Sequence, residues 1–376
     1  MQTLSPLTSK KIKFWTFISM TLVVFIHGYN LNQRYLEPWT LPGEPLTITG
    51  FTEYFIANGI SRFVIPLLFI ISGYLLAMRD TQPYRQLIKK RLRTLGLPYL
   101  LWSAIGLAFV YVLELFPYTR SLVASSRMMA VSDTQLLLHD NTWYQLFGRW
   151  LLLPVPYQLW FLRVLIIYNL AYPALRWCVT HKTAKWIYFI IATLLWLGTV
   201  NLLLIEGEGL LFFALGIWMQ KSSFNIEKPN RLLNPLLWCI VCFVVCVIKT
   251  LLAFNGEALI GSSVYTVLTL LHKLAMFSAL VAVWYGGDWL MQFFMNRKWF
   301  VWLSGFSFII YVSHAPAVAL FIDAYFQLLH YTYAYRILTF ILLPLSLIAS
   351  CITLGLLLRS LTPKLYTLLT GGRGFT

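Results

Sequence analysis

The sequence predicts an all-α protein, a polytopic membrane helix bundle of about ten transmembrane helices. Two observations carry this prediction. The chain of 376 residues is 59% hydrophobic and only 11% charged, whereas a soluble domain carries about 25% charged residues. It also contains repeated apolar runs, and a run of about 20 residues is long enough to cross a bilayer. No long polar block separates these runs, so we expect one domain over residues 1–376.

Ten apolar runs are expected to form the spanning helices. The first run continues to His27 without the small-residue cleavage site of a secretory signal, so we interpret it as a helix. The sixth run is the shortest, and it begins beside Glu206 and Glu208. The expected spans are residues 14–31, 58–78, 95–116, 151–175, 185–205, 209–220, 232–254, 264–286, 299–320 and 337–358.

The distribution of charge predicts the orientation of these helices. If the N-terminus is cytoplasmic, most of the 29 Lys and Arg residues fall in inner segments and most of the 13 acidic residues in outer ones. Such a bias is what the positive-inside rule requires. We therefore expect a multi-pass protein with both termini in the cytoplasm. The net charge of +16 follows from these inner loops, so nucleic acid is not an expected partner.

Two long segments are expected on the outer side, Asn32 to Ala57 and Pro117 to Arg149. Aromatic residues such as Trp143 and Tyr157 occur in or beside them. Such side chains anchor a protein at the membrane interface, or they stack on sugar rings at a carbohydrate-binding mouth. The sequence leaves both interpretations open.

Polar residues inside the apolar runs are the first candidates for chemistry. His27 ends the first run, and an imidazole in that position needs a partner or a function. Arg62 lies at a comparable depth in the second run, where an arginine can extend to the interface, hold an anion or orient a histidine. Pro66 predicts a kink, and Ser72-Gly73 predicts the close approach of another helix.

Further charged residues lie within other runs. Arg163, His272 and Lys273 are expected to line a tunnel through the bundle or to pair with acidic side chains or helix carbonyls. Glu114 and Lys249 lie near outer helix ends, so we expect them to extend toward the interface.

A basic cluster precedes the third run. Lys89, Lys90, Arg91 and Arg93 lie within five residues of one another. Such a cluster orients the protein and contacts anionic lipid, or it binds the phosphates of a nucleotide-bearing donor such as coenzyme A. Both interpretations are compatible with the cluster alone.

No metal site is expected. The five cysteines lie in or beside apolar runs, and Cys239 and Cys242, although they have CxxC spacing, have no His or acidic partner nearby. The sequence also lacks a zinc motif, a P-loop and a dinucleotide fingerprint. A Gly-x-Ser-x-Gly elbow is absent, which argues against a serine-hydrolase mechanism.

Five sequence blocks, taken in order, resemble a known family. The blocks are TLVVFIH, RFVIPLLFIISGYLL, KKRLRTLGLPYLLW, QLWFLRVLIIYNL and SGFSFIIYVSHAPAV. The set resembles acyltransferase family 3, whose members are bacterial membrane proteins that O-acetylate surface and exported glycans. The Arg before VIP resembles the subgroup that includes exopolysaccharide-modifying proteins. The resemblance spans most of the chain, implies ten helices and implies a bacterial cell inner membrane.

The resemblance also implies roles for individual residues. His27 falls on the essential histidine of the family, so we expect it to be the general base that takes a hydroxyl proton. Tyr311 and His314 fall in the late IYxxH block. Arg62, Tyr311 or a serine is expected to stabilise the tetrahedral oxyanion. Arg91 falls on the first basic position of the arginine motif. The expected donor-binding residues are Lys89, Lys90, Arg91 and Arg93, and the expected acceptor-binding residues are Tyr157, Trp160 and Arg163.

The chain departs from the family pattern at three positions. Thr16 stands where the family usually has Arg or Lys, and Lys13 replaces an acidic residue often found a little earlier. Thr94 stands at the second arginine of the arginine motif, with Arg93 adjacent. These departures predict altered handling of the donor.

The expected function is therefore that of a membrane O-acetyltransferase. It would move an acetyl group from cytoplasmic acetyl-coenzyme A to a hydroxyl of an exported or cell-surface polysaccharide. The alternatives are an exporter of polysaccharide or lipid-linked sugar without acyl transfer, and a non-catalytic partner of a synthase complex. Expected partners are the glycan acceptor, the lipid bilayer and polysaccharide synthase or export machinery, with no metal cofactor.

Overall fold

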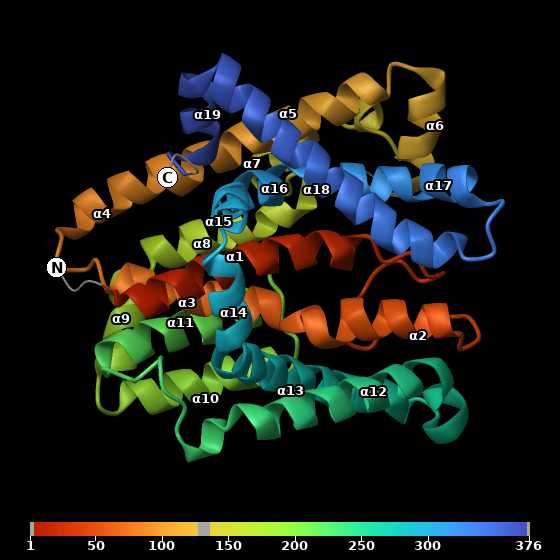
Figure 1. Cartoon of the computed structure of the whole chain (residues 1–376). Helices are drawn as coiled ribbons and strands as arrows, with labels where there is room; N and C mark the ends of the chain where they lie inside the picture. The colour runs from red at the N-terminus through yellow and green to blue at the C-terminus, as the bar shows by residue number, and fades with distance from the viewer. Residues whose placement is uncertain (1–3, 127–135, 374–376) are drawn as a thin grey trace.

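The structure, a computed structural model, describes residues 4–126 and 136–373. In this part of the chain the regular elements are helices, and one isolated β-bridge joins Asn201 and Glu206. Most of the long helices run roughly along one direction and form a bundle (Figure 1). The predicted all-α class is confirmed.

Five helical segments of the described chain are long and apolar enough to cross a membrane, and two bent helix pairs raise the number to as many as seven. A multi-pass membrane protein is therefore supported, while the count of ten spans and the side on which the termini lie stay predictions. The five segments are Ile48–Ala77, Tyr84–Leu113, α12 (Pro235–Ile260), α13 (Ser263–Gly286) and α18 (Tyr335–Leu361).

The second span begins at Ile48 rather than at residue 58. The predicted start is wrong, and so is the extension of the first outer loop to Ala57. The physical reason is a helix cap, because the Thr47 hydroxyl accepts a hydrogen bond from the Gly50 N–H at 2.9 Å. The segment consists of α2 (Ile48–Tyr54), a π turn (Phe55–Gly59), a 3-10 turn (Ile60–Phe63) and α3 (Val64–Ala77).

The third span begins at Tyr84 rather than at residue 95. The basic cluster predicted to precede it is itself helical, because no proline lies between Pro83 and Pro98, and the helix continues past Gly96 through a π turn. The segment consists of α4 (Tyr84–Arg91), a π turn (Leu92–Gly96) and α5 (Leu97–Leu113).

Two predicted spans are broken rather than continuous. The expected span 151–175 becomes α8 (Trp160–Leu170) and α9 (Tyr172–Thr180), which meet at a bend of 68°. The expected span 299–320 contains α16 (Ser307–Ser313) and α17 (Ala317–Leu329), which meet at a bend of 75°. Prolines stand at both breaks, Pro173 and Pro316, and proline cannot donate the backbone hydrogen bond that would continue a helix.

Shorter helices complete the bundle. The fifth predicted span, residues 185–205, is shorter than expected, as α10, whereas the sixth, residues 209–220, is slightly longer, as α11. Positions 127–135, in the predicted outer segment Pro117 to Arg149, lie outside the described residues. The remaining helices are α6 (Pro117–Ser126), α7 (Trp143–Leu151), α10 (Ala184–Leu197), α11 (Gly207–Lys221), α14 (Asp288–Met295), α15 (Lys298–Ser304) and α19 (Pro363–Thr370).

Helix α1 (Pro6–His27) lies at the centre of the bundle. Ser5 caps its start by accepting a hydrogen bond from the Thr8 N–H at 3.1 Å. The helix contacts α3, α14, α16 and α18, and Figure 1 shows it between α3 and α18. Its last residue, His27, is therefore surrounded by elements that are distant in the sequence.

Glycines set the separation of α3 and α11. A Cβ atom added at Gly73 would overlap with the carbonyl oxygen of Phe213, and one added at Gly216 would overlap with the carbonyl oxygen of Ile70. Each helix therefore packs its backbone directly on the other, as small residues allow in membrane proteins. The predicted close approach at Ser72-Gly73 is confirmed.

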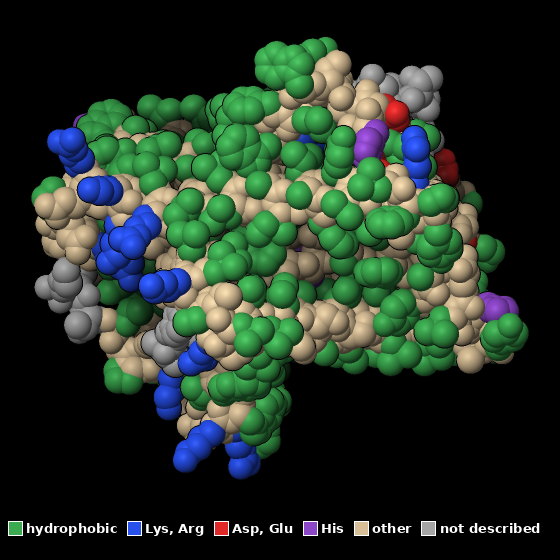
Figure 2. Space-filling model, turned by 90° about the horizontal axis from the view of Figure 1, so that it is seen from above, with side chains coloured by type: hydrophobic (Ala, Val, Ile, Leu, Met, Phe, Trp, Pro, Cys, Tyr) green, Lys and Arg blue, Asp and Glu red, His purple; other side chains and the backbone are tan. Residues whose placement is uncertain are grey.

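Charged side chains are distributed unevenly. In Figure 2, Lys and Arg gather toward the end where α4 lies, and hydrophobic side chains cover the middle of that face. Near this end the Asp80 carboxylate forms an ion pair with Lys221, with Nζ and Oδ2 2.6 Å apart, and accepts a hydrogen bond from the Tyr172 hydroxyl at 2.8 Å. Partial burial raises the pKa of Asp80, but hydrogen bonds from Lys221 and Tyr172 outweigh it and hold the pKa below its usual value.

Two charged residues expected at the interface are instead buried. Glu114 is 2% exposed and accepts hydrogen bonds from the backbone N–H groups of Leu138, at 2.7 Å, and His139, at 3.0 Å. Lys249 is fully buried and donates to the carbonyl of Asn58. The interface prediction is wrong at both positions, because tertiary partners satisfy these charges inside the protein.

The packing of α3 on α11 can be tested with Gly73→Ala. The new methyl group has no space beside the Phe213 carbonyl, so we expect a loss of roughly 1–3 kcal/mol of stability. Thermal unfolding in detergent measures it as a lower melting temperature. Gly148→Ala is the matched control, because nothing lies within 4 Å of a Cβ atom at Gly148. Equal melting temperatures for the two variants would contradict this packing.

Candidate functional site

A basic cavity of about 620 Å³ opens at the end of the bundle where α1 begins. Five basic side chains are among its lining residues, and no Asp or Glu occurs among those that the structure describes. An excess of positive charge without carboxylate partners favours an anionic ligand. The basic residues are Lys13, Arg79, Lys90, Arg91 and Arg373.

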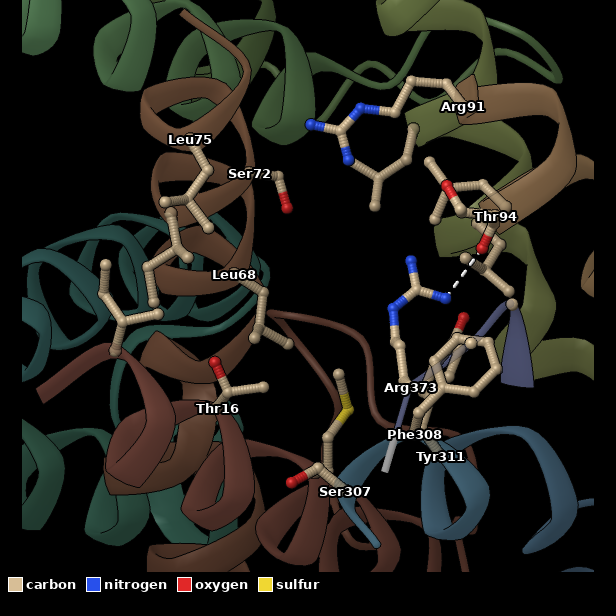
Figure 3. A pocket seen from close by; sticks show the side chains of 18 of the residues that line it. Thr16, Leu68, Ser72, Leu75, Arg91, Thr94, Ser307, Phe308, Tyr311 and Arg373 are labelled. Atoms are coloured by element: carbon tan, nitrogen blue, oxygen red, sulfur yellow. Dashed lines mark hydrogen bonds between the residues drawn. The ribbon is translucent and has the colours of Figure 1, made fainter. Parts of the chain in front are cut away.

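Only part of the predicted donor-binding cluster lines this cavity. Lys90 and Arg91 line it, whereas Lys89 and Arg93 are exposed and are not among its lining residues. Figure 3 shows Arg91 and Arg373 on the same side of the cavity, with Thr16 and Ser72 across from them. The cavity thus contains two of the four predicted residues.

The three departures from the family pattern also meet here. Lys13, Thr16 and Thr94 all line the basic cavity, although they come from α1 and from the π turn after α4. The altered residues are thus concentrated in one site rather than scattered through the fold.

The deep part of the basic cavity is mostly apolar. Met20, Leu68, Phe161 and Leu165 line it, together with Tyr311. A ligand with an anionic head and a neutral arm suits this combination of a charged mouth and an apolar interior.

His27 and His314 form a stacked pair. Their ring centroids are 5.5 Å apart and the ring planes differ by 22°. The Tyr157 ring packs edge-on against His27, with centroids 4.8 Å apart. The family resemblance predicted that both histidines belong to the site. In the structure His27, at the end of α1, stacks on His314, which lies in the break between α16 and α17.

The hydrogen bonding of the two imidazoles differs. His314 is fully buried, and its Nδ1 lies 2.9 Å from the Ile310 carbonyl oxygen. Because a carbonyl only accepts, Nδ1 carries the proton and Nε2 retains its lone pair. That Nε2 is buried without a hydrogen-bond partner. His27 is partly accessible, and no described residue donates to or accepts from its ring.

Gln158 braces this pair and was not predicted from the sequence. Its Nε2 donates to the Val312 carbonyl at 3.1 Å, and its own backbone carbonyl accepts the Tyr311 hydroxyl at 2.7 Å. These bonds hold the turn before α8 against α16, which places Tyr157 and His314 on either side of His27. The sequence feature that could have revealed Gln158 is the position of this polar residue beside an apolar block, QLWFL. The Tyr311 hydroxyl, a predicted oxyanion donor, is engaged in this brace.

A second cavity of about 450 Å³ contains Arg62 and two of the predicted acceptor-binding residues, Trp160 and Arg163. The third, Tyr157, contacts His27 instead and is not part of its lining. The exposed Trp143 lines neither cavity. We call this space the mixed-charge cavity, because its lining residues also include Glu37, Glu206, Glu208, His272 and Lys273.

Arg62 connects the mixed-charge cavity to His27. Its Nη2 donates to the Leu36 carbonyl at 2.9 Å, and its Nε is buried without a protein partner. The guanidinium is close enough for its charge to act on the His27 imidazole. No hydrogen bond joins the two side chains in the described part of the chain, and the partnership of Arg62 with His27 stays a prediction.

Two helices line both cavities. On α3, Ile65 lines the mixed-charge cavity and Leu68 the basic cavity; on α8, the neighbours Trp160 and Phe161 are divided in the same way. The lining residues of the two cavities interleave along α8, so the cavities lie against different faces of that helix. His27 packs on Tyr157, just before α8, and neither His27 nor His314 is among the lining residues of the two cavities.

A family description covers most of the chain. The acyltransferase domain model Acyl_transf_3 matches residues 12–355. The chain belongs to this acyltransferase family. The match includes His27, Arg62, Arg91 and His314, and it ends before Arg373. The chain is also 23% identical to the succinoglycan biosynthesis protein ExoH of Rhizobium meliloti (strain 1021), over 97% of this chain and 92% of that protein. No solved structure shows significant similarity.

The brace on α16 can be tested with Tyr311→Phe. The ring is kept, but the Gln158 carbonyl loses its donor in a buried position, so we expect a loss of about 1 kcal/mol. Thermal unfolding measures the change. Tyr333→Phe removes the hydroxyl of a fully exposed tyrosine and should leave the melting temperature unchanged. A Tyr311→Phe protein as stable as the parent would show that the hydroxyl does not support α16.

Proposed function

We propose that this acyltransferase is an O-acetyltransferase of the bacterial inner membrane. It transfers an acetyl group from cytoplasmic acetyl-coenzyme A to a hydroxyl of an exported or cell-surface polysaccharide. The observation that carries the proposal is the basic cavity, which has five Lys and Arg residues and no Asp or Glu among its described lining residues, in a bundle that also holds the stacked pair His27 and His314.

The basic cavity is the proposed donor site. Guanidinium groups bind phosphates through paired, charge-assisted hydrogen bonds, and Arg91 and Arg373 point into the cavity in Figure 3. The apolar interior along Met20 and Phe161 suits the neutral arm that carries the thioester. His27 lies seven residues beyond Met20 on α1, a rise of about 10 Å. To bring the thioester to His27, the neutral arm of the donor would therefore have to extend beyond Met20, the deepest α1 residue that lines the cavity.

The mixed-charge cavity is the proposed acceptor site. Sugars present hydroxyls in the ring plane and C–H groups on the faces, so aromatic rings combined with carboxylates suit them. Trp160 and Trp196 supply rings, and Glu206 and Glu208 supply carboxylates. The relative named for succinoglycan biosynthesis supports a polysaccharide as the acceptor.

The proposed reaction uses His27 as the base. Its imidazole takes the proton of the acceptor hydroxyl as the oxygen attacks the thioester carbon. The C–S bond then breaks, a C–O ester bond remains, and the proton passes to the leaving thiolate, giving free coenzyme A. Arg62, whose Nε has no protein partner, is placed to balance the charge on the oxyanion. His314 orients the His27 ring by stacking.

The proposal predicts that His27→Gln nearly abolishes transfer. Without the base, the rate should fall by about 10²- to 10⁴-fold while the protein stays folded. The assay is release of free coenzyme A by purified protein, together with acetyl mass added to the acceptor glycan. His330→Gln, an exposed histidine near the α17 end, serves as the control. Unchanged transfer in His27→Gln would remove His27 from the mechanism.

The same assay separates the enzyme from an exporter. Movement of glycan without release of coenzyme A by the parent protein would contradict acyl transfer altogether. Loss of acetyl groups from the surface glycan of a deletion strain, measured by mass spectrometry, would instead agree with the proposal and identify the acceptor class.

The acceptor site is tested with Trp160→Ala. Removal of the ring should raise the KM for the glycan by about fivefold and leave the affinity for coenzyme A unchanged, because Trp160 lines only the mixed-charge cavity. Steady-state kinetics with varied acceptor measures this effect. Trp143→Ala, which removes an exposed ring outside both cavities, is the control. An unchanged KM in Trp160→Ala would exclude this ring from the acceptor site.

A further inference from the structure

The segment after α19 closes one side of the basic cavity. Gly371, Gly372 and Arg373 are lining residues of this cavity. Gly371 adopts φ +61°, and a Cβ atom there would lie 2.5 Å from the Thr94 carbonyl oxygen. Glycine is therefore required for two independent reasons, the left-handed backbone and the close approach to Thr94. Gly372 N–H donates to the Thr367 carbonyl at 2.9 Å and completes the helix cap.

Helix α19 fixes this segment in place. The Trp102 indole on α5 donates to the Leu369 carbonyl at 3.0 Å, and the side chains of Tyr366 and Leu369 are buried. The position of Arg373 follows from this docking and not from contacts of its own side chain alone.

Arg373 is held from one side only. Its Nη1 donates to the carbonyls of Thr94, at 2.7 Å, and Thr370, at 3.0 Å. Its guanidinium lies 4.5 Å from the centre of the Phe308 ring, a favourable cation–π distance. No described residue accepts from Nε or Nη2, and the side chain projects into the cavity in Figure 3. Two edges of the guanidinium are thus available to a ligand.

The surrounding charge favours an anion at this point. Arg373 is close enough to Arg79 and Arg91 for the three charges to repel one another. Burial, and then the Arg79 charge, lower the pKa of Arg373 to about 10, so it stays protonated at neutral pH. Three clustered guanidinium groups with no carboxylate among the described lining residues are stabilised by a bound phosphate.

We propose that Arg373 is a donor-binding residue, whose Nε and Nη2 donate hydrogen bonds to a phosphate of the coenzyme A donor. The proposal rests on the proposed function, since it names a contact of the same donor site. Arg373 reaches the donor from residue 373, beyond the matched range 12–355. It fills the place beside Thr94, where the family resemblance leads one to expect a basic side chain.

The first test compares Arg373→Gln with the parent protein. Full-length protein in nanodiscs of zwitterionic lipid is titrated with coenzyme A by calorimetry. Loss of charge-assisted hydrogen bonds should weaken coenzyme A binding about tenfold. Arg373→Lys should recover part of the lost affinity, because a lysine keeps the positive charge but not the planar, two-pronged set of N–H donors. Lys364→Gln removes an exposed basic residue of α19 outside the cavity and should leave the affinity unchanged.

The phosphate contact is tested with a second probe. Pantetheine has the neutral arm and the thiol but no phosphate, so the Arg373→Gln protein should bind it as the parent does. An equal loss of pantetheine affinity would show that the substitution disturbs the cavity as a whole and would overturn the proposed contact.

Gly371→Ala moves Arg373 without replacing it. The methyl group meets the Thr94 carbonyl, so the segment should undock and coenzyme A affinity should fall as in Arg373→Gln. The double variant should be no weaker than either single variant, because both remove the same contact. Gly148→Ala is the matched control for this substitution. Additive losses would show that the segment does not act through Arg373.

The outcomes separate this proposal from the proposed function. If the parent binds coenzyme A and Arg373→Gln binds it equally well, the role of Arg373 is wrong and the donor site stands. If the parent does not bind coenzyme A, both are wrong. If Arg373→Gln changes only the retention of anionic lipid in mixed nanodiscs, Arg373 binds a headgroup and not the donor.

Discussion

The structure depends on the requirement that polar groups inside an apolar bundle find partners there. The stacked pair His27 and His314 meets this requirement only in part. His314 satisfies its Nδ1 with the Ile310 carbonyl and is fully buried, whereas no residue that the structure describes forms a hydrogen bond with the His27 ring. The bundle thus holds one imidazole in a fixed tautomer and leaves its neighbour available. Gln158, which bonds to α16 from the turn before α8, keeps the two together.

This requirement also explains why the fold contains two different cavities. Charged side chains in a bundle are satisfied by each other, by backbone or by a water-filled space. In the mixed-charge cavity, Glu206 and Glu208 face Lys273, so much of the charge is balanced within the protein. In the basic cavity the charge is left for a ligand. Residues of α3 and α8 line both spaces, so the same two helices form part of the wall of each cavity.

The positions that depart from the family pattern come together in the folded protein. Thr16 and Thr94 are far apart in sequence but line the same basic cavity. Arg373 binds the Thr94 carbonyl and brings a guanidinium to the position where Thr94 lacks one. A sequence comparison that stops at residue 355 does not contain this residue. The proposed donor site therefore combines residues of the family domain with a segment outside it.

The sequence by itself determined the helical class, the multi-pass membrane character and the family, because hydropathy and short motifs are local properties of the chain, and it singled out His27 as the candidate base. It also located the close approach at Gly73. Only the tertiary structure decided which residues share a site. The stacking of His27 on His314, the burial of Glu114 and Lys249, and the division of the basic cluster into lining and exposed residues all depend on which helices pack together. The breaks between α8 and α9 and between α16 and α17 escaped prediction for a related reason, since proline permits a bend but the surrounding helices decide whether the chain takes it.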